Sequence, residues 1–115
     1  MTLTFQINYR AVYGQRLCVI ETGSQTFGWT EQKPLELRCE GDDFWTATVL
    51  VEQPSGEIGY HYAIRLDNGG FLYEVGACRE LAWKTTDKNI VLRDFWRAAT
   101  EEDSFRSRAF SFRRQ

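Results

Sequence analysis

Large apolar residues alternate with small or polar ones along residues 58–66, and this is the clearest periodic pattern in the chain. Every second position there is apolar and large: Ile58, Tyr60, Tyr62, Ile64 and Leu66. Because successive side chains of a β-strand point to opposite faces, the pattern predicts a strand with one buried face and with His61 on the other face. The sequence Asp-Asn-Gly-Gly at 67–70 is typical of a hairpin turn, so residues 71–75 are predicted to return as the partner strand.

Six other segments are predicted to be short strands, from the same alternation or from a short apolar run: 3–7, 17–21, 35–37, 44–52, 80–83 and 89–92. Residues typical of turns lie between them at fairly regular intervals. No convincing amphipathic helix precedes Asp94. The sequence therefore predicts an all-β chain folded as an antiparallel β-sandwich of about seven to eight strands.

The last part of the chain differs from the rest, because residues 94–115 are charged and carry only isolated aromatic residues. We interpret residues 1–96 as one domain and residues 97–115 as a linker or tail leading to a missing downstream domain. The alternative is a tail that folds back on the sandwich. Met1 leads directly into a predicted strand without an apolar signal segment, so a cytoplasmic location is expected.

Composition argues against several classes of partner. Hydrophobic residues make up 43% of the chain and aromatic residues 15%, which favours a packed core over disorder. The 14 lysines and arginines are balanced by 16 aspartates and glutamates, and no basic stripe is present, so no nucleic acid is expected. No apolar run approaches the length of a membrane span. The three cysteines lack metal-ligand spacing, which indicates reduced thiols and no metal site.

Catalysis is hard to build from these residues. The one histidine, His61, lies in the middle of a predicted strand. The sequence contains no Gly-x-Ser-x-Gly nucleophile elbow, no glycine-rich phosphate-binding loop and no His-Glu-x-x-His zinc-binding motif. The acidic residues at 40–43 share one predicted turn, where they are expected to be solvated. We therefore expect neither catalytic residues nor a cofactor in this chain.

Trp29 lies in a predicted loop, where a large apolar side chain needs an explanation. Two interpretations remain open: the ring closes one end of the sandwich, or it is exposed for a ligand. A flat ring suits the apolar C–H face of a pyranose sugar, because stacking removes apolar area from water while the hydroxyls stay free. Covering roughly 100 Å² of ring face would contribute about 2–3 kcal/mol.

Four short motifs follow one another along the chain. They are Tyr13-Gly14-Gln15 before an apolar strand and Gly23-Ser24; Phe27-Gly28-Trp29 before Leu35 and Leu37; Phe44-Trp45 at the start of a strand; and Tyr60-His61-Tyr62 before Tyr73-Glu74 and Cys78-Arg79-Glu80. In this order and spacing, residues 3–96 resemble the family 20 carbohydrate-binding modules, the starch-binding domains. Each motif alone is weakly specific, and the four in order are fairly specific.

The resemblance implies an immunoglobulin-like β-sandwich that binds α-1,4-glucans without catalysis: starch, glycogen, maltooligosaccharides and cyclodextrins. By position, it implies the carbohydrate-binding residues Trp29, His61, Tyr73, Glu74 and Tyr13. Trp29 and Tyr73 match two stacking tryptophans of a first site, where His61 matches a lysine that bonds sugar hydroxyls. Tyr13 matches a stacking tyrosine of a second site. Glu74 and Arg79 match a pair that braces the first site.

The sequence departs from the family pattern at this first site. Tyr73 stands in place of a tryptophan, His61 in place of a lysine and Cys78 in place of an asparagine. One residue is missing between Gly28 and Trp29, so the loop is one residue shorter than the family's.

The layout of the chain is similar to that of intracellular 4-α-glucanotransferases, amylomaltase-type enzymes that carry such modules ahead of a catalytic barrel. This resemblance implies a covalently linked catalytic domain. The alternative function is a protein–protein interaction module, which would present a contiguous apolar patch in place of separate rings with polar edges. A small enzyme acting alone would need a deep pocket with coupled titratable groups.

Overall fold

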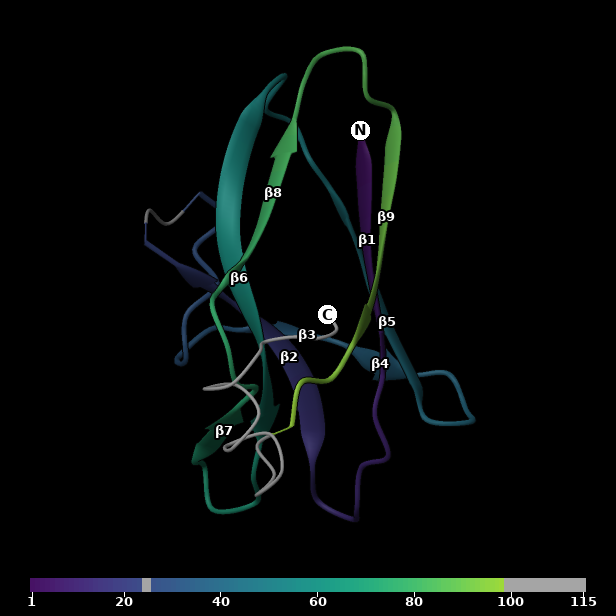
Figure 1. The fold of residues 1–115 in the computed structure, drawn as a ribbon, viewed down its shortest axis with the longest axis vertical. Helices are drawn as coiled ribbons and strands as arrows, with labels where there is room; N and C mark the ends of the chain where they lie inside the picture. The colour runs from purple at the N-terminus through teal and green to yellow at the C-terminus, as the bar shows by residue number, and fades with distance from the viewer. Residues whose placement is uncertain (24–25, 99–115) are drawn as a thin grey trace, which may run out of the picture.

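The computed structural model describes residues 1–23 and 26–98, which form two β-sheets packed face to face (Figure 1). Sheet A has the strand order β4-β5-β1-β9, and sheet B has the order β3-β2-β6-β7 with β8 also paired to β6. The nine strands of the described residues are β1 (Thr2–Asn8), β2 (Arg16–Thr22), β3 (Leu35–Glu36), β4 (Arg38–Cys39), β5 (Phe44–Leu50), β6 (Gly56–Arg65), β7 (Phe71–Tyr73), β8 (Arg79–Trp83) and β9 (Asn89–Phe95). The predicted all-β sandwich is confirmed.

The central strand of sheet B is β6, the strand that the alternating pattern predicts. Its first five residues pair with β8 and its last three with β7, while β2 lies along its other edge. Four of its five predicted inward residues are buried, Ile58, Tyr60, Tyr62 and Ile64, and the fifth, Leu66, is half-buried just past the end of the strand. The predicted turn to β7 forms as well, with the Gly69 N–H donating to the Leu66 carbonyl at 2.9 Å. Gly69 has a φ of 88°, a conformation that glycine adopts without steric cost.

The facing sides of the two sheets form one apolar core, with Phe5 of β1 near its centre. Its ring makes edge-to-face contacts with Tyr60 at 5.2 Å and Tyr62 at 6.4 Å between centroids. Both tyrosine hydroxyls donate to the carboxylate of Asp94 on β9, at 3.2 and 2.7 Å. Burial, and then the charge of Asp94, raises the pKa of both tyrosines, so these bonds link the two sheets at neutral pH.

One strand pair departs from the predicted antiparallel arrangement. β1 and β9 run parallel, with Thr2 opposite Asn89 and Asn8 opposite Phe95. The other strand pairs of the described chain are antiparallel. A parallel pair needs a long connection, and here most of the domain lies between the two strands.

In place of the single predicted strand 35–37, residues 35–39 form two short strands. β3 pairs with β2 in sheet B, and β4 pairs with β5 in sheet A. Between them Leu37 is buried, and its N–H donates to the Leu17 carbonyl at 3.0 Å. The chain therefore crosses from one sheet to the other at Leu37.

The described structure continues past the predicted domain boundary at residue 96. The Arg97 guanidinium donates to the Ala77 carbonyl at 2.7 Å, and the Val75 N–H donates to the Arg97 carbonyl at 2.9 Å. Residues 99–115, which hold most of the predicted linker or tail, lie outside the described residues. Within the described ranges, no helix is long and apolar enough to cross a membrane.

Candidate functional site

The outer face of sheet B brings together two residues of the predicted first site, His61 and Tyr73. His61 and Ala63 point away from the core because they alternate with the buried tyrosines of β6. Strand pairing places Cys18 opposite Ala63 and Ile20 opposite His61 on β2, and it places Tyr73 opposite Ala63 on β7. Residues directly opposite each other in adjacent strands share a face, so these five side chains lie on the same outer face, where Cys18, Ile20 and Ala63 are buried.

His61 and Tyr73 are in ring contact on this surface. Their centroids are 6.2 Å apart, and the rings are nearly perpendicular at 86°. Tyr73 is 39% exposed and donates its hydroxyl to the carboxylate of Glu31. Burial, and then the bond to Glu31, raises the Tyr73 pKa. The Nδ1 atom of His61 is buried and has no hydrogen-bond partner among the described residues.

A small apolar cluster supports this pair. Cys18, Ile20 and Ala63 are buried together, and Phe71 packs against them. The Cys18 thiol donates to the Ala63 carbonyl at 3.5 Å. Burial, and then the charge of Glu36, raises the pKa of Cys18 to about 12, so the thiol is protonated and a poor nucleophile at neutral pH.

The ring of Trp29 packs against the core. It lies edge-on to Phe5, with 5.6 Å between centroids, and stacks on Phe27 at 4.7 Å. Phe27 in turn stacks on Trp83 at 5.8 Å. No ring contact joins Trp29 to Tyr73 in the described part of the chain. Of the two interpretations of Trp29, this half-buried position favours the one in which the ring closes one end of the sandwich. Contact of Trp29 with a sugar stays a prediction.

A buried carboxylate, that of Glu21, fixes the loop that carries these rings. It accepts hydrogen bonds from the N–H groups of Thr26, Phe27 and Trp29, at 2.7, 2.8 and 3.0 Å. The Glu21 N–H also donates to the Trp29 carbonyl at 2.9 Å. Sequence reasoning missed this role. The available signal is a charged residue at the end of the otherwise apolar run 17–21.

Glu74, 4% exposed, is the centre of a charged cluster beside Tyr73. Arg79 donates two hydrogen bonds to its carboxylate, both 2.8 Å long, and Arg97 donates two longer ones of 3.5 and 3.4 Å. Burial by itself would raise the Glu74 pKa, but the bonds and charge of Arg79 outweigh burial and lower it. The arrangement is that of a brace between β7 and β8, and direct contact of Glu74 with a sugar stays a prediction.

Tyr13, the residue predicted for a second site, is 99% exposed on the loop between β1 and β2. The next residue, Gly14, has a φ of 90° and lies directly against the carboxylate of Asp67 in the turn from β6 to β7. Within the described residues, Tyr13 makes no contact with another aromatic ring. The structure therefore presents it as a separate, open ring.

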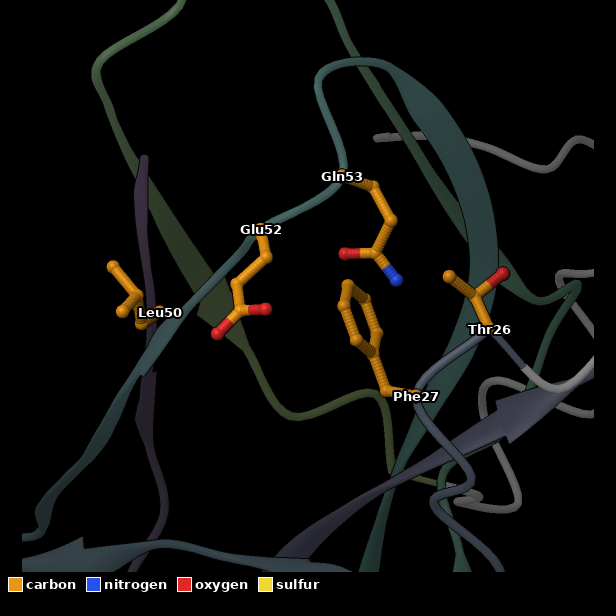
Figure 2. A pocket seen from close by; sticks show the side chains of 5 residues that line it. All are labelled: Thr26, Phe27, Leu50, Glu52 and Gln53. Atoms are coloured by element: carbon orange, nitrogen blue, oxygen red, sulfur yellow. The ribbon is translucent and has the colours of Figure 1, made fainter.

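A depression of about 490 Å³ opens between the loop at Phe27 and the connection from β5 to β6 (Figure 2). Its lining residues are Thr26, Phe27, Leu50, Glu52 and Gln53. Figure 2 shows the Gln53 amide above the Phe27 ring and the Glu52 carboxylate directed toward the same space. These groups can form hydrogen bonds, but they do not pair a nucleophile with a base. The described residues contain no group of three or more His, Cys, Asp or Glu that could hold a metal ion.

No protein-family model and no curated protein matches the sequence. Solved structures do match the fold. The family 15 glycoside hydrolase glucoamylase from Hypocrea jecorina matches 84% of this chain with a TM-score of 0.70 and 18% identity. The γ-CGTase from alkalophilic Bacillus clarkii matches 84% with a TM-score of 0.69 and 15% identity. This chain covers only 17% and 15% of those two longer chains.

A third solved structure is the family 20 CBM of the maltotetraose-forming amylase from Pseudomonas saccharophila STB07. It matches 82% of this chain with a TM-score of 0.62 and 11% identity, and the match covers 100% of that CBM. At such low identities the likeness establishes the fold alone. The chain therefore has the β-sandwich fold that a family 20 CBM also has.

Proposed function

We propose that this chain is a non-catalytic module that binds α-1,4-glucans, with the His61–Tyr73 pair as its contact surface. The observation that carries the proposal is the fold likeness over the full length of a family 20 CBM. It is supported by the order of the four sequence motifs. A glucoamylase and a CGTase among the matching structures favour the same ligand class.

The geometry of the pair suits a sugar. Tyr73 offers a partly exposed ring for the apolar face of a pyranose, and its hydroxyl and Glu31 offer hydrogen-bonding groups at the ring edge. On the same face lies the buried apolar cluster of Cys18, Ile20 and Ala63. Affinity is expected to be weak, because one or two stacked rings must offset the cost of association.

The finer proposals concern the whole protein. We infer a parent 4-α-glucanotransferase, in which this module holds glucan for a covalently linked catalytic domain. We also infer a cytoplasmic location. Both inferences rest on the resemblance of the chain's layout and of the Trp96-Arg97 segment to those enzymes.

The test is a calorimetric titration with maltoheptaose and β-cyclodextrin. Tyr73→Ala is expected to weaken binding at least tenfold, since about 1.4 kcal/mol of ring contact corresponds to a factor of ten. Tyr73→Phe keeps the flat ring and is the matched control, with a smaller expected loss. Thermal unfolding of each variant checks that the fold is intact.

Absence of binding to both sugars, together with absence of retention on starch granules, would sink the proposal and favour a protein-interaction module. Binding that survives Tyr73→Ala but is lost in Tyr13→Ala would move the glucan site to the loop between β1 and β2. Tyr13 is suited to this comparison, because its exposed ring can be removed with little effect on stability.

A further inference from the structure

The outer face of sheet A presents a second arrangement of rings and polar groups, at the end of β1 that holds Asn8. Phe44 of β5 and Phe95 of β9 both lie directly opposite Asn8. Opposite residues share a face, and adjacent strands lie about 4.8 Å apart. The Phe44 and Phe95 backbones therefore lie about 10 Å apart, one on each side of the Asn8 amide.

The next row of the same face is polar. Thr46 and Arg93 lie opposite Gln6, on either side of it. Among the described residues, the side chains of Gln6, Asn8 and Arg93 make no hydrogen bond or ion pair with another residue. Their donors and acceptors are therefore available to a bound molecule.

These residues surround a depression of about 470 Å³, whose lining is Gln6, Asn8, Phe44, Arg93, Asp94 and Phe95. The size is within the range of small-ligand sites, which is roughly 300–1,000 Å³. Phe95 is 72% exposed. The Asp94 carboxylate binds Tyr60, Tyr62 and Arg79 between the sheets, so it is already occupied.

We propose that this depression is a saccharide-binding subsite on the opposite sheet from the His61–Tyr73 pair. Pyranose faces lie against Phe44 and Phe95, and sugar hydroxyls bond to Asn8, Gln6 and Arg93. The placement rests on the geometry of sheet A, whereas the choice of an α-glucan as its ligand rests on the proposed function. With a contact surface on each sheet, one module can hold two glucan segments at once.

A sugar fits this face better than a protein does. The two rings are separated by an amide and do not form a contiguous apolar patch. Thr4 and Thr48, which bond to each other at 3.0 Å, continue the same face beyond Gln6. A face of hydroxyl and amide groups between isolated rings suits a ligand with apolar faces and hydroxylated edges.

The test is an amide-resonance NMR titration of the full chain with maltoheptaose, β-cyclodextrin and cellohexaose. Saturable shifts are expected at Asn8, Phe44 and Phe95, with a midpoint separate from that of the shifts at His61 and Tyr73. Cellohexaose tests whether the subsite distinguishes α- from β-linked glucose.

Two variants on β9 make a matched pair. Phe95→Ala is expected to weaken the sheet A midpoint about tenfold, leaving the sheet B midpoint and the melting temperature unchanged. Val91→Ala removes an apolar side chain that is 48% exposed on the same face and strand, and it should change neither midpoint. Phe95→Trp keeps a flat ring and is expected to preserve binding.

The inference is overturned if none of the three sugars shifts the sheet A resonances at millimolar concentration, or if Phe95→Ala leaves the sheet A midpoint unchanged. Shifts on sheet A without shifts on sheet B would support the subsite and overturn the His61–Tyr73 surface. Shifts on sheet B without shifts on sheet A would support the His61–Tyr73 surface and overturn the subsite. The two proposals therefore fail separately.

Discussion

Glu74 is the buried charge that ties β7, β8 and the end of β9 together, and it is the residue on which pH is expected to act. Its pKa is lowered from 4.5, because the bonds and charge of Arg79 outweigh burial. A carboxyl whose folded pKa lies below its unfolded value stabilises the fold fully above the unfolded value. It loses that contribution as the pH falls through 4.5 toward the folded pKa.

Glu74→Gln is therefore expected to lower the free energy of unfolding by about 3 kcal/mol at neutral pH, because it leaves the Arg79 guanidinium with one fewer buried partner. The difference from wild type should shrink as the pH falls from 7 through 4.5 toward the folded pKa of Glu74, since the unfolded wild-type chain takes up a proton at this residue that the folded chain does not. Urea unfolding across this range measures both effects. Glu57→Gln, at an exposed residue, is the control and should neither lower the free energy of unfolding nor change its pH dependence. If the difference between Glu74→Gln and wild type stays the same at low pH, Glu74 is not the group on which pH acts.

At the scale of elements, alternation of apolar residues predicts the strands well because it reports which face is buried. It predicts neither which strands are neighbours nor their directions, so the parallel pairing of β1 and β9 could not be read from it. For a similar reason, the pattern does not show that residues 35–39 form two strands, β3 and β4, in different sheets. Leu37 is buried at the crossing itself, so the apolar pattern continues across it without interruption.

The direction of the Trp29 ring depends on the bonds of Glu21 to the backbone of Trp29, which the sequence pattern does not report. We expect the length of this loop, one residue shorter than in the family that the sequence resembles, to matter for the same reason. Shifting a strand-like segment by one residue moves its side chains to the opposite face. The His61–Tyr73 contact was easier to anticipate, because it follows directly from the hairpin.

Insertion of one threonine between Gly28 and Trp29 is expected to turn the Trp29 ring away from Phe5 and toward the outer face. The tryptophan emission should shift to longer wavelength and become more accessible to a quencher. If sheet B binds glucan as proposed, the affinity for maltoheptaose should rise about tenfold, as one more ring can stack.

The matched control is the same insertion between Pro54 and Ser55, in another exposed connection, which should change neither the emission nor the affinity. An unchanged emission in the Gly28–Trp29 insertion would mean that the loop absorbs the extra residue without turning the ring. The register argument would then be wrong.

At the scale of the whole molecule, contacts between the two sheets stabilise the sandwich near the end of β9. Local sequence patterns do not report such contacts. β9 belongs to sheet A, but Arg97 just after it binds Glu74 and the Ala77 carbonyl on the sheet B side. The change in composition near residue 94 predicts a boundary at residue 96, which stays a prediction. It does not reveal that Arg97, which resembles a linker residue in sequence, is part of the packed domain.

Two truncated chains, one ending at Ala98 and one ending at Trp96, test where the domain ends. The shorter chain lacks the Arg97 bonds to Glu74, Ala77 and Val75, so it should be less stable by about 1–3 kcal/mol. Arg97→Ala in the full chain should reproduce part of the loss, because it removes the guanidinium but keeps the carbonyl that Val75 bonds. Equal stability of the two truncated chains would place the boundary at residue 96, and the contacts of Arg97 would then be a consequence of the fold rather than a support for it.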